Sequence, residues 1–137
     1  MVDRSALGAT GAPFVLDVEN GKLREFAAAT FGTVSADGTA PPTFLTTAFH
    51  WQHADSDPWE QVRMDPARGL HAEQEFVFHG APPKAGDRLI GTSRIADIYD
   101  KQRRSGGTLT FVVMVTEFRD ESGRLVAEST LTGVETE

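Results

Sequence analysis

The sequence contains no cysteine among its 137 residues. Disulfide bonds, thiolate zinc sites and cysteine nucleophiles are therefore excluded. Basic residues are also in the minority, because 13 Lys and Arg face 20 Asp and Glu, which leaves a net charge of −7. Affinity for nucleic acids comes largely from Lys and Arg that neutralise phosphates, so this composition argues against a nucleic-acid partner.

Long hydrophobic runs are absent as well. A transmembrane helix needs about 18 or more consecutive apolar residues, and the sequence has no such run and no signal-like start. We therefore expect a soluble, cytoplasmic protein with no membrane partner. A length of 137 residues, 39% of them hydrophobic, predicts one compact domain with a modest core. An active site in so small a domain has to be shallow or shared with a second subunit.

The first part of the chain has the pattern of an arm followed by a helix. Residues 1–13 are small, polar and rich in glycine, which predicts a flexible N-terminal arm before a domain that spans residues 14–137. From Asn20 onward the apolar residues have the spacing of an amphipathic helix of about three turns. Asn20 is its predicted N-cap and Gly32 its predicted stop.

A second helix is expected after a loop rich in Gly, Asp and Pro. The segment PPTFLTTAFHW suggests a helix that begins at Pro42, with Phe44, Leu45, Ala48 and Phe49 on its apolar face. Threonine and phenylalanine are weak helix formers, so we expect packing to hold this helix in the interior. The polar residues 53–69 that follow it predict an exposed, mobile loop.

Beyond Leu70 the hydrophobic pattern takes a period of two. Four segments alternate for part of their length and carry β-branched or aromatic residues: 73–79, 88–100, 107–119 and 124–135. The short joins between them have turn composition, which predicts hairpins and an antiparallel meander. The apolar run FVVMV in the third segment predicts a central strand covered on both faces. Helices followed by such a sheet indicate an α+β domain whose sheet wraps around a buried helix.

Five stretches carry a resemblance to a known family: VENGKLREFAAAT, APPTF, LHAEQEFVFHGAPPKAGDRLIGTSRIADIYDKQ, GGTLTFVVMVTEFRDESGRLVAES and TGVE. Their order and spacing resemble the N-terminal (FAS1-like) dehydratase-type hot-dog domain of the MaoC-like dehydratase family. That group includes non-catalytic subunits of (3R)-hydroxyacyl thioester dehydratases. The resemblance covers almost the whole chain and implies a single hot-dog domain. It also implies reversible addition of water to a trans-2-enoyl thioester of coenzyme A or acyl carrier protein, with no cofactor.

The family's catalytic motif is missing from the stretch where the resemblance places it. Catalytic members use an Asp and a His in a Gly-Asp-x-Asn-Pro-x-His segment after the first helix, as the base and acid that hydration needs. Here the stretch reads FGTVSADGTAPPTF, so Thr33 follows Gly32 where the aspartate belongs, and no histidine precedes Thr43. Asp37 is the only acid in it. The resemblance therefore implies that this chain lacks the dyad.

His71 is one remaining candidate for catalysis. His71 and Glu73 occupy alternate positions of a predicted strand, so both side chains face the same way, and a carboxylate can orient an imidazole. A hydrogen-bonded structural histidine explains the same pair, and both interpretations stay open.

His50 is the other candidate. It stands three residues before His53, and Asp55 and Asp57 follow. A catalytic metal site needs at least three convergent ligands, whereas polar residues are also expected where a helix runs out into solvent. We predict no metal here.

Substrate-binding residues are predicted in two places. The buried helix and its ends would line the acyl tunnel, through Thr43, Phe44, Phe49 and Trp51. The segment KQRRSGG puts Arg103 and Arg104 at a hairpin tip. Such a run is either a solvated turn or a contact for the phosphates of coenzyme A or of a phosphopantetheine arm, since Arg forks match phosphate geometry.

Three hypotheses about function follow. The leading one is the non-catalytic, tunnel-forming half of a heteromeric (R)-specific enoyl-thioester hydratase, paired with a MaoC-like subunit that carries Asp and His. The second is a self-sufficient homodimeric hydratase or thioesterase that uses His50, His71 or a nearby carboxylate. The third is a binding module that presents acyl thioesters without chemistry. All three predict a dimer, because a lone hot-dog domain leaves a sheet edge open.

Overall fold

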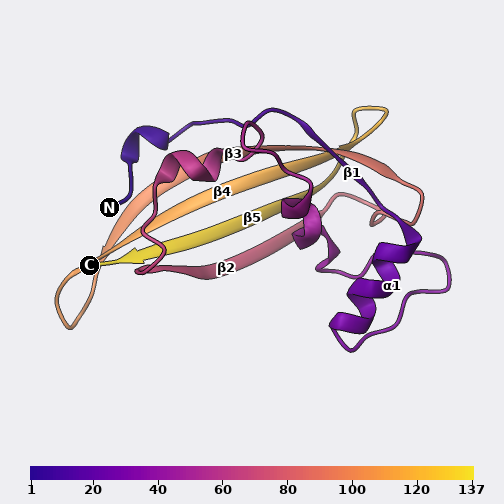
Figure 1. The fold of residues 1–137 in the computed structure, drawn as a ribbon, viewed down its shortest axis with the longest axis horizontal. Coiled ribbons are helices and arrows are strands. Elements are labelled where there is room, and N and C mark those ends of the chain that lie inside the picture. Colours follow the sequence, from indigo (N-terminus) through magenta and orange to yellow (C-terminus); the bar gives the residue numbers. More distant parts are fainter.

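The structure is a computed structural model that describes the whole chain, residues 1–137. One five-stranded antiparallel sheet dominates it, with the strands in the order β1-β3-β4-β5-β2 (Figure 1). The strands are β1 (Phe14–Asp17), β2 (Gly69–Phe78), β3 (Arg88–Gln102), β4 (Thr108–Asp120) and β5 (Leu125–Thr136). Short helices pack against one face of the sheet: η1 (Arg4–Ala6), α1 (Asn20–Ala29), η2 (Phe44–His50) and η3 (Pro58–Val62).

The four long strands lie within a few residues of the segments predicted from the period of two, but the predicted meander is wrong in one respect. β3, β4 and β5 are joined by hairpins as expected. β2 pairs instead with β5, from Gly69 opposite Glu135 to Phe78 opposite Ala127. The join GAPPKAGD, between β2 and β3, is therefore a crossover from one edge of the sheet to the other side. Its amino-acid composition alone does not distinguish it from a hairpin turn.

β4 is central, as predicted, but it is buried on one face only. Its even-numbered side chains, from Val112 to Phe118, point toward the helices and are buried, whereas the odd-numbered ones are half-buried on the outer face. An antiparallel sheet with helices on one side leaves its other face to solvent. The unbroken apolar run therefore marks a strand at the centre of the sheet without a second covering layer.

The predicted buried helix is present, but it is a 3₁₀ helix, η2, that starts at Phe44 and not at Pro42. Its backbone bonds span three residues, for example from the Thr46 N–H to the Thr43 carbonyl. With about three residues per turn, side chains three apart share a face. Phe44, Leu45 and Ala48 are buried accordingly, whereas Phe49 joins Thr46 on the open side and is 63% exposed. The prediction that Phe49 packs inward is wrong for this reason.

Helix α1 also differs from the sequence pattern at both ends. Its N-cap is Glu19, which makes no side-chain capping bond, so Asn20 is the first helical residue and not the cap. The residue that turns the chain out of the helix is Phe31, with a φ of 58°, and not Gly32. The 53–69 stretch is likewise no open loop, because η3 forms within it and both Pro58 and Val62 are fully buried.

The N-terminal arm lies along β3. The Gly8 N–H donates to the Ile95 carbonyl, the Ile95 N–H donates back to Ala9, and Val2 and Ala6 are buried in a small cluster with η3. The flexibility of residues 1–13 in solution stays a prediction. None of the helices combines the length and the apolar character that crossing a membrane requires.

Candidate functional site

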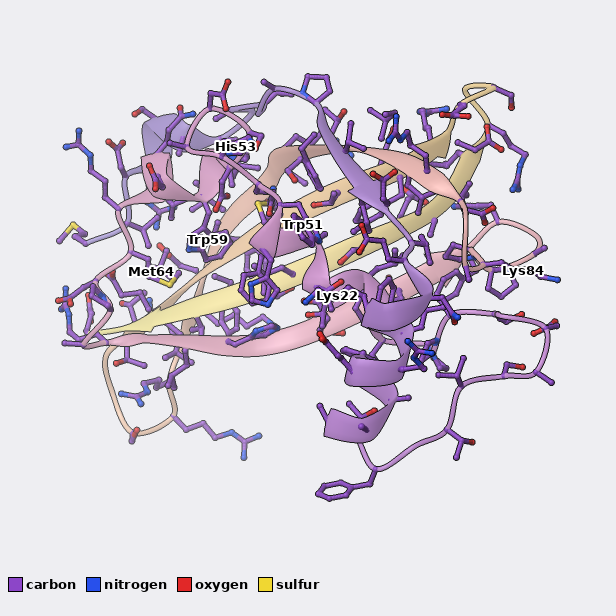
Figure 2. The ribbon with its side chains drawn as sticks, turned by 45° about the vertical axis from the view of Figure 1, so that its right-hand side comes forward. Lys22, Trp51, His53, Trp59, Met64 and Lys84 are labelled. Atoms are coloured by element: carbon purple, nitrogen blue, oxygen red, sulfur yellow. The ribbon has the colours of Figure 1, made fainter.

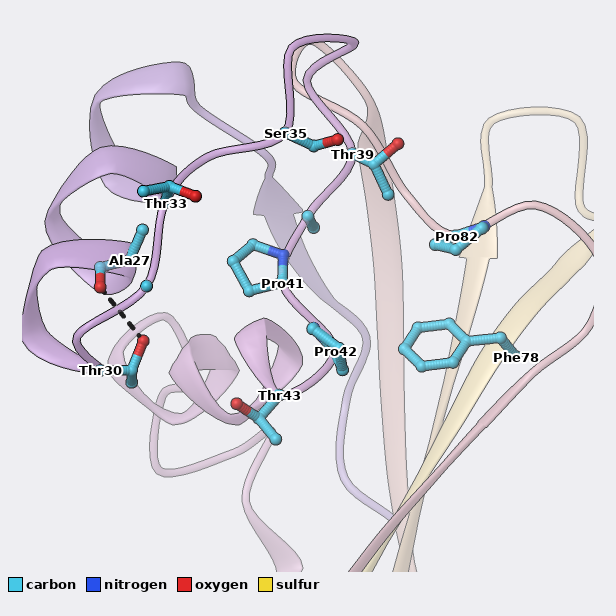
Figure 3. Close-up of a pocket in the computed structure, with 12 residues that line it drawn as sticks. Ala27, Thr30, Thr33, Ser35, Thr39, Pro41, Pro42, Thr43, Phe78 and Pro82 are labelled. Carbon is cyan, nitrogen blue, oxygen red and sulfur yellow. Dashed lines mark hydrogen bonds between the residues drawn. The ribbon is translucent and has the colours of Figure 1, made fainter.

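A pocket of about 590 Å³ opens between α1, η2 and the end of β2, and we call it the threonine pocket (Figure 3). Its walls are the segment that joins α1 to η2, the last turn of α1, and two residues at the end of β2 and just beyond it. The lining residues are Ala27, Thr30, Gly32, Thr33, Ser35, Thr39, Ala40, Pro41, Pro42, Thr43, Phe78 and Pro82.

Two loops hold the outer wall of the threonine pocket in place. The Ala40 N–H donates to the Pro83 carbonyl at 2.9 Å, and the Ala85 N–H donates to the Gly38 carbonyl at 2.9 Å. These bonds join the α1–η2 loop to the β2–β3 loop, although more than 40 residues separate them along the chain. The prolines and glycines that predicted loops from the sequence therefore shape one wall together.

The walls of this pocket carry hydroxyl groups but no titratable side chain. The Thr30 hydroxyl is directed at its own helix, where it donates to the Phe26 carbonyl at 2.9 Å (Figure 3 draws its bond to Ala27). Asp37, the only acid of the segment, lies outside the lining. Hydrogen bonds from the Thr39 hydroxyl, the Thr39 amide and Ser35, with the charge of Lys84, hold the pKa of Asp37 far below its usual range. Asp37 therefore stays a carboxylate and holds no proton to donate.

His71 lines a second, smaller pocket of about 270 Å³, the histidine pocket, between η2 and the inner face of the sheet. Phe49, Gln74, Thr116 and Ser129 line it as well, and the Gln74 amide donates to the Ser129 hydroxyl at 2.8 Å.

The predicted partnership of the His71 and Glu73 side chains is wrong. A β-bulge shifts the register between them, so the two side chains no longer share a face. The Nε2 of His71 instead lies 3.2 Å from the backbone carbonyl oxygen of Glu73, to which it donates when it carries a proton. His71 is thus positioned by the main chain without a carboxylate to activate it.

His50 lines neither pocket. It is the last residue of η2, it is exposed, and its ring centroid lies 3.9 Å from that of Phe49. His53 bonds through its backbone to Ser56, and Asp57 caps η3 by accepting from the Trp59 N–H. No group of three or more His, Asp or Glu side chains converges in a geometry that could hold a metal ion.

The predicted substrate-binding residues are spread over the molecule. Thr43 lines the threonine pocket and Phe49 the histidine pocket, whereas Phe44 is buried in the core. Trp51, labelled in Figure 2, lines neither pocket and is 41% exposed.

Arg103 and Arg104 lie on the β3–β4 hairpin, at the end of the sheet opposite α1 (Figure 1). The length of β2, nine steps of about 3.3 Å, separates that end from the pocket. The two arginines therefore do not join one continuous site with Thr43 in a single chain. Contact of any of these residues with a ligand stays a prediction.

Sequence reasoning missed most of the threonine pocket. Thr33, Ser35 and Thr39 belong to the stretch that aligns with the catalytic motif, but their side chains match no residue of that motif, so the sequence does not single them out as pocket residues. Phe78 and Pro82 are far from α1 in the sequence, and only the pairing of β2 with β5 brings them close to that helix. The one signal available was the turn chemistry of both loops.

Comparison with known proteins identifies the family. Residues 5–129 match the family model described as the FAS1-like, dehydratase domain region. A UPF0336 protein of Parafrankia sp. (strain EAN1pec) is 38% identical over 122 residues, which are 88% of this chain and 70% of that protein.

Solved structures show the same fold. The 3R-hydroxyacyl-ACP dehydratase complex HadBC of Mycobacterium tuberculosis, in a C-terminally truncated form, has a chain with a TM-score of 0.68 and 26% identity, covering 94% of this chain and 96% of that one. The ChsH1-ChsH2 complex of the same organism has a chain with a TM-score of 0.70 at 15% identity, covering 93% and 84%, and this likeness concerns the fold alone. The chain therefore belongs to the FAS1-like dehydratase-domain family and has the hot-dog fold of the MaoC-like dehydratases.

Proposed function

We propose that this chain is the non-catalytic half of a heteromeric (R)-specific enoyl-thioester hydratase, where it binds the acyl thioester and a second hot-dog subunit supplies the Asp and His. The observation that carries the proposal is the threonine pocket. It is built from the segment that holds the acid and base in catalytic members of the family, yet none of its twelve lining residues can transfer a proton near neutral pH. The pocket is suited to hold a substrate and unsuited to convert it.

The lining favours an uncharged ligand. Threonine methyls, proline rings, alanines and the Phe78 ring give apolar contact, and hydroxyls give a few polar ones. Ligand sites are commonly concave, largely apolar and about 300–1,000 Å³ in volume. An acyl chain with its thioester fits this description, on coenzyme A or on a carrier protein.

The β2 side of the molecule supports a second subunit. β2 is an edge strand of ten residues with one side unpaired. Large apolar side chains are exposed on β2 itself, at Leu70 and Val77, and at the end of η2, at Phe49 and Trp51. Long open edges with apolar neighbours are aggregation-prone unless a partner pairs with them. The HadBC and ChsH1-ChsH2 structures are complexes by name, which agrees with a two-subunit arrangement here.

The test is hydration of a short and a long trans-2-enoyl-CoA, followed by loss of enoyl absorbance. The chain is assayed alone, then mixed with a MaoC-like hydratase subunit of the same organism that carries the Asp and His. We expect no turnover by this chain alone, and turnover by the mixture above that of the second subunit alone, because acid and base then come from one subunit and part of the tunnel from the other. Robust hydration by this chain alone would contradict the proposal.

A second candidate function, a self-sufficient hot-dog hydratase or thioesterase, rests on His71. His71 lines the histidine pocket beside η2, whereas His50 does not. If it were the base, His71→Ala would lower turnover by about 100-fold or more, the usual scale of general base catalysis. Under the leading proposal we expect His71→Ala to change the turnover of the mixture by less than about 5-fold, well below the effect of removing a general base. His50→Ala is the matched control, because His50 lies outside both pockets. A loss of activity in His71→Ala but not in His50→Ala would favour the second function.

A further inference from the structure

Phe31 occupies a position that helices usually give to glycine. Its N–H donates to the Ala28 carbonyl at 3.3 Å, and the next N–H, of Gly32, donates to the Ala27 carbonyl at 2.8 Å. With Thr30 as the C-cap, these two bonds form a Schellman motif whose C′ residue is Phe31. C′ is left-handed, and the φ of Phe31 is 58°. A bulky side chain is unfavourable there because its Cβ crowds the following carbonyl oxygen.

No packing contact within the chain compensates for the backbone strain at Phe31. The residue is 100% exposed, so its ring buries no apolar surface in the isolated subunit. Glycine at the same position would close the helix in the same way without the crowding. Strained residues that the rest of the structure holds in place are characteristic of functional positions. The ring at Phe31 therefore needs an explanation outside the isolated chain.

Phe31 lies at the side where a partner subunit is proposed. Its neighbours Thr30, Gly32 and Thr33 line the threonine pocket, which Phe78 at the end of β2 also lines. Helix α1 lies on the β2 side of the sheet, and its C-terminal end projects past that strand (Figure 1). A strand added antiparallel to β2 would pass close to this projection. Phe31 would then extend the contact that Phe49 and Trp51 begin.

The start of β2 shows what kind of surface can receive the ring. A hollow of about 360 Å³ lies there, lined among others by Trp59, Met64, Pro66 and Leu131. Figure 2 shows Trp59 and Met64 together at this end, away from Lys22 of α1. Antiparallel pairing along β2 sets the start of one edge strand against the end of the other. A hot-dog subunit with an equivalent apolar hollow would present it on the side of Phe31.

We propose that Phe31 is an anchor residue: the second hot-dog subunit pairs along β2 and buries the Phe31 ring in an apolar hollow beside the start of its own edge strand. This inference rests on the proposed function for the existence of that subunit. Buried aromatic anchors commonly dominate interface energetics. The left-handed backbone fixes the direction in which the Phe31 Cα–Cβ bond leaves the helix end before the partner arrives, so binding has to order only the side-chain torsions.

The test compares Phe31→Gly, Phe31→Ala and Phe31→Leu with the wild-type chain, using a MaoC-like hydratase subunit of the same organism that carries the Asp and His as the binding probe. We expect Phe31→Ala and Phe31→Gly to raise the dissociation constant about 30-fold, as for a hot-spot aromatic, and Phe31→Leu to raise it only about 3-fold. In urea unfolding of the isolated chain, Phe31→Gly should lower the unfolding equilibrium constant about 3- to 10-fold, because it removes the left-handed crowding. Affinity and stability would thus move in opposite directions.

Val15→Ala is the matched control, because Val15 is an exposed apolar residue on the opposite edge strand, β1, and its replacement should leave the dissociation constant unchanged. If wild type and the Phe31 variants bind the subunit equally well, the anchor is refuted and the proposed function survives. If the wild-type chain does not bind the subunit at all, the proposed function fails and the anchor with it. Unchanged subunit affinity with weaker turnover of carrier-protein substrates would instead assign Phe31 to the carrier protein, and would also overturn the inference.

Discussion

Replacing Thr43 by Trp should lower kcat/KM of the two-subunit hydratase about 100-fold, because small displacements of a bound substrate have effects of this size. Thr43 is exposed at the start of η2 and lines the threonine pocket. An indole there fills space that the acyl thioester needs, without disturbing a buried side chain. The measurement is hydration of short and long enoyl-CoA by the reconstituted mixture, and kcat/KM should fall more for the long substrate.

Thr46→Trp is the matched control for Thr43→Trp. Thr46 is likewise an exposed threonine, three residues after Thr43 and within η2, but it lines the histidine pocket. If the threonine pocket holds the substrate, Thr46→Trp should keep kcat/KM within about 3-fold, well short of the loss that misplacement produces. The opposite ranking, with Thr46→Trp the more damaging, would move the acyl site to the histidine pocket and bring His71 back as a catalyst.

Replacing Phe44 by Ala should reduce the free energy of unfolding by about 3–5 kcal/mol, the usual range for a buried phenylalanine. Phe44 is 1% exposed, belongs to the main core cluster, and meets Phe26 of α1 edge to face with ring centroids 5.6 Å apart. Its ring helps to join η2 to α1 within that cluster. Domains of this size have only about 5–15 kcal/mol of stability, so the urea midpoint should fall sharply or the chain should fail to fold.

Phe49→Ala is the control that tests whether the loss of stability comes from the burial of Phe44 and not from the type of residue replaced. Phe49 is the same residue type on the same short helix, but it is 63% exposed. Exposed substitutions usually change stability by no more than about 0.5 kcal/mol. Equal losses for Phe44→Ala and Phe49→Ala in urea unfolding would mean that η2 packs on another face. In the two-subunit complex Phe49→Ala should instead weaken assembly, because Phe49 belongs to the exposed apolar set on the β2 side.

The candidate site shows how the information is divided between sequence and tertiary structure. The absence of an acid at Thr33 and of a histidine before Thr43 is visible in the sequence, because the comparison concerns residue types at given positions. The pocket around those positions is not visible in the sequence, because Phe78 and Pro82 reach it only through the pairing of β2 with β5. His71 and Glu73 show the same limit, since alternation predicts a shared face and one bulge removes it.

By itself, the sequence determined the four long strands, the α+β class and the family, and it showed that Asp and His are missing from the stretch compared with the catalytic motif. These depend on local periodicity and on the order of short motifs, which can be recognised without knowing any tertiary contact. Only the tertiary structure decided the pairing of β2 with β5, the 3₁₀ form of η2 and the left-handed Phe31. Each of these depends on which distant surfaces meet, or on how three or four backbone bonds close at one helix end. A pattern read along one chain does not contain that information, because long-range packing overrides local preference where the two compete.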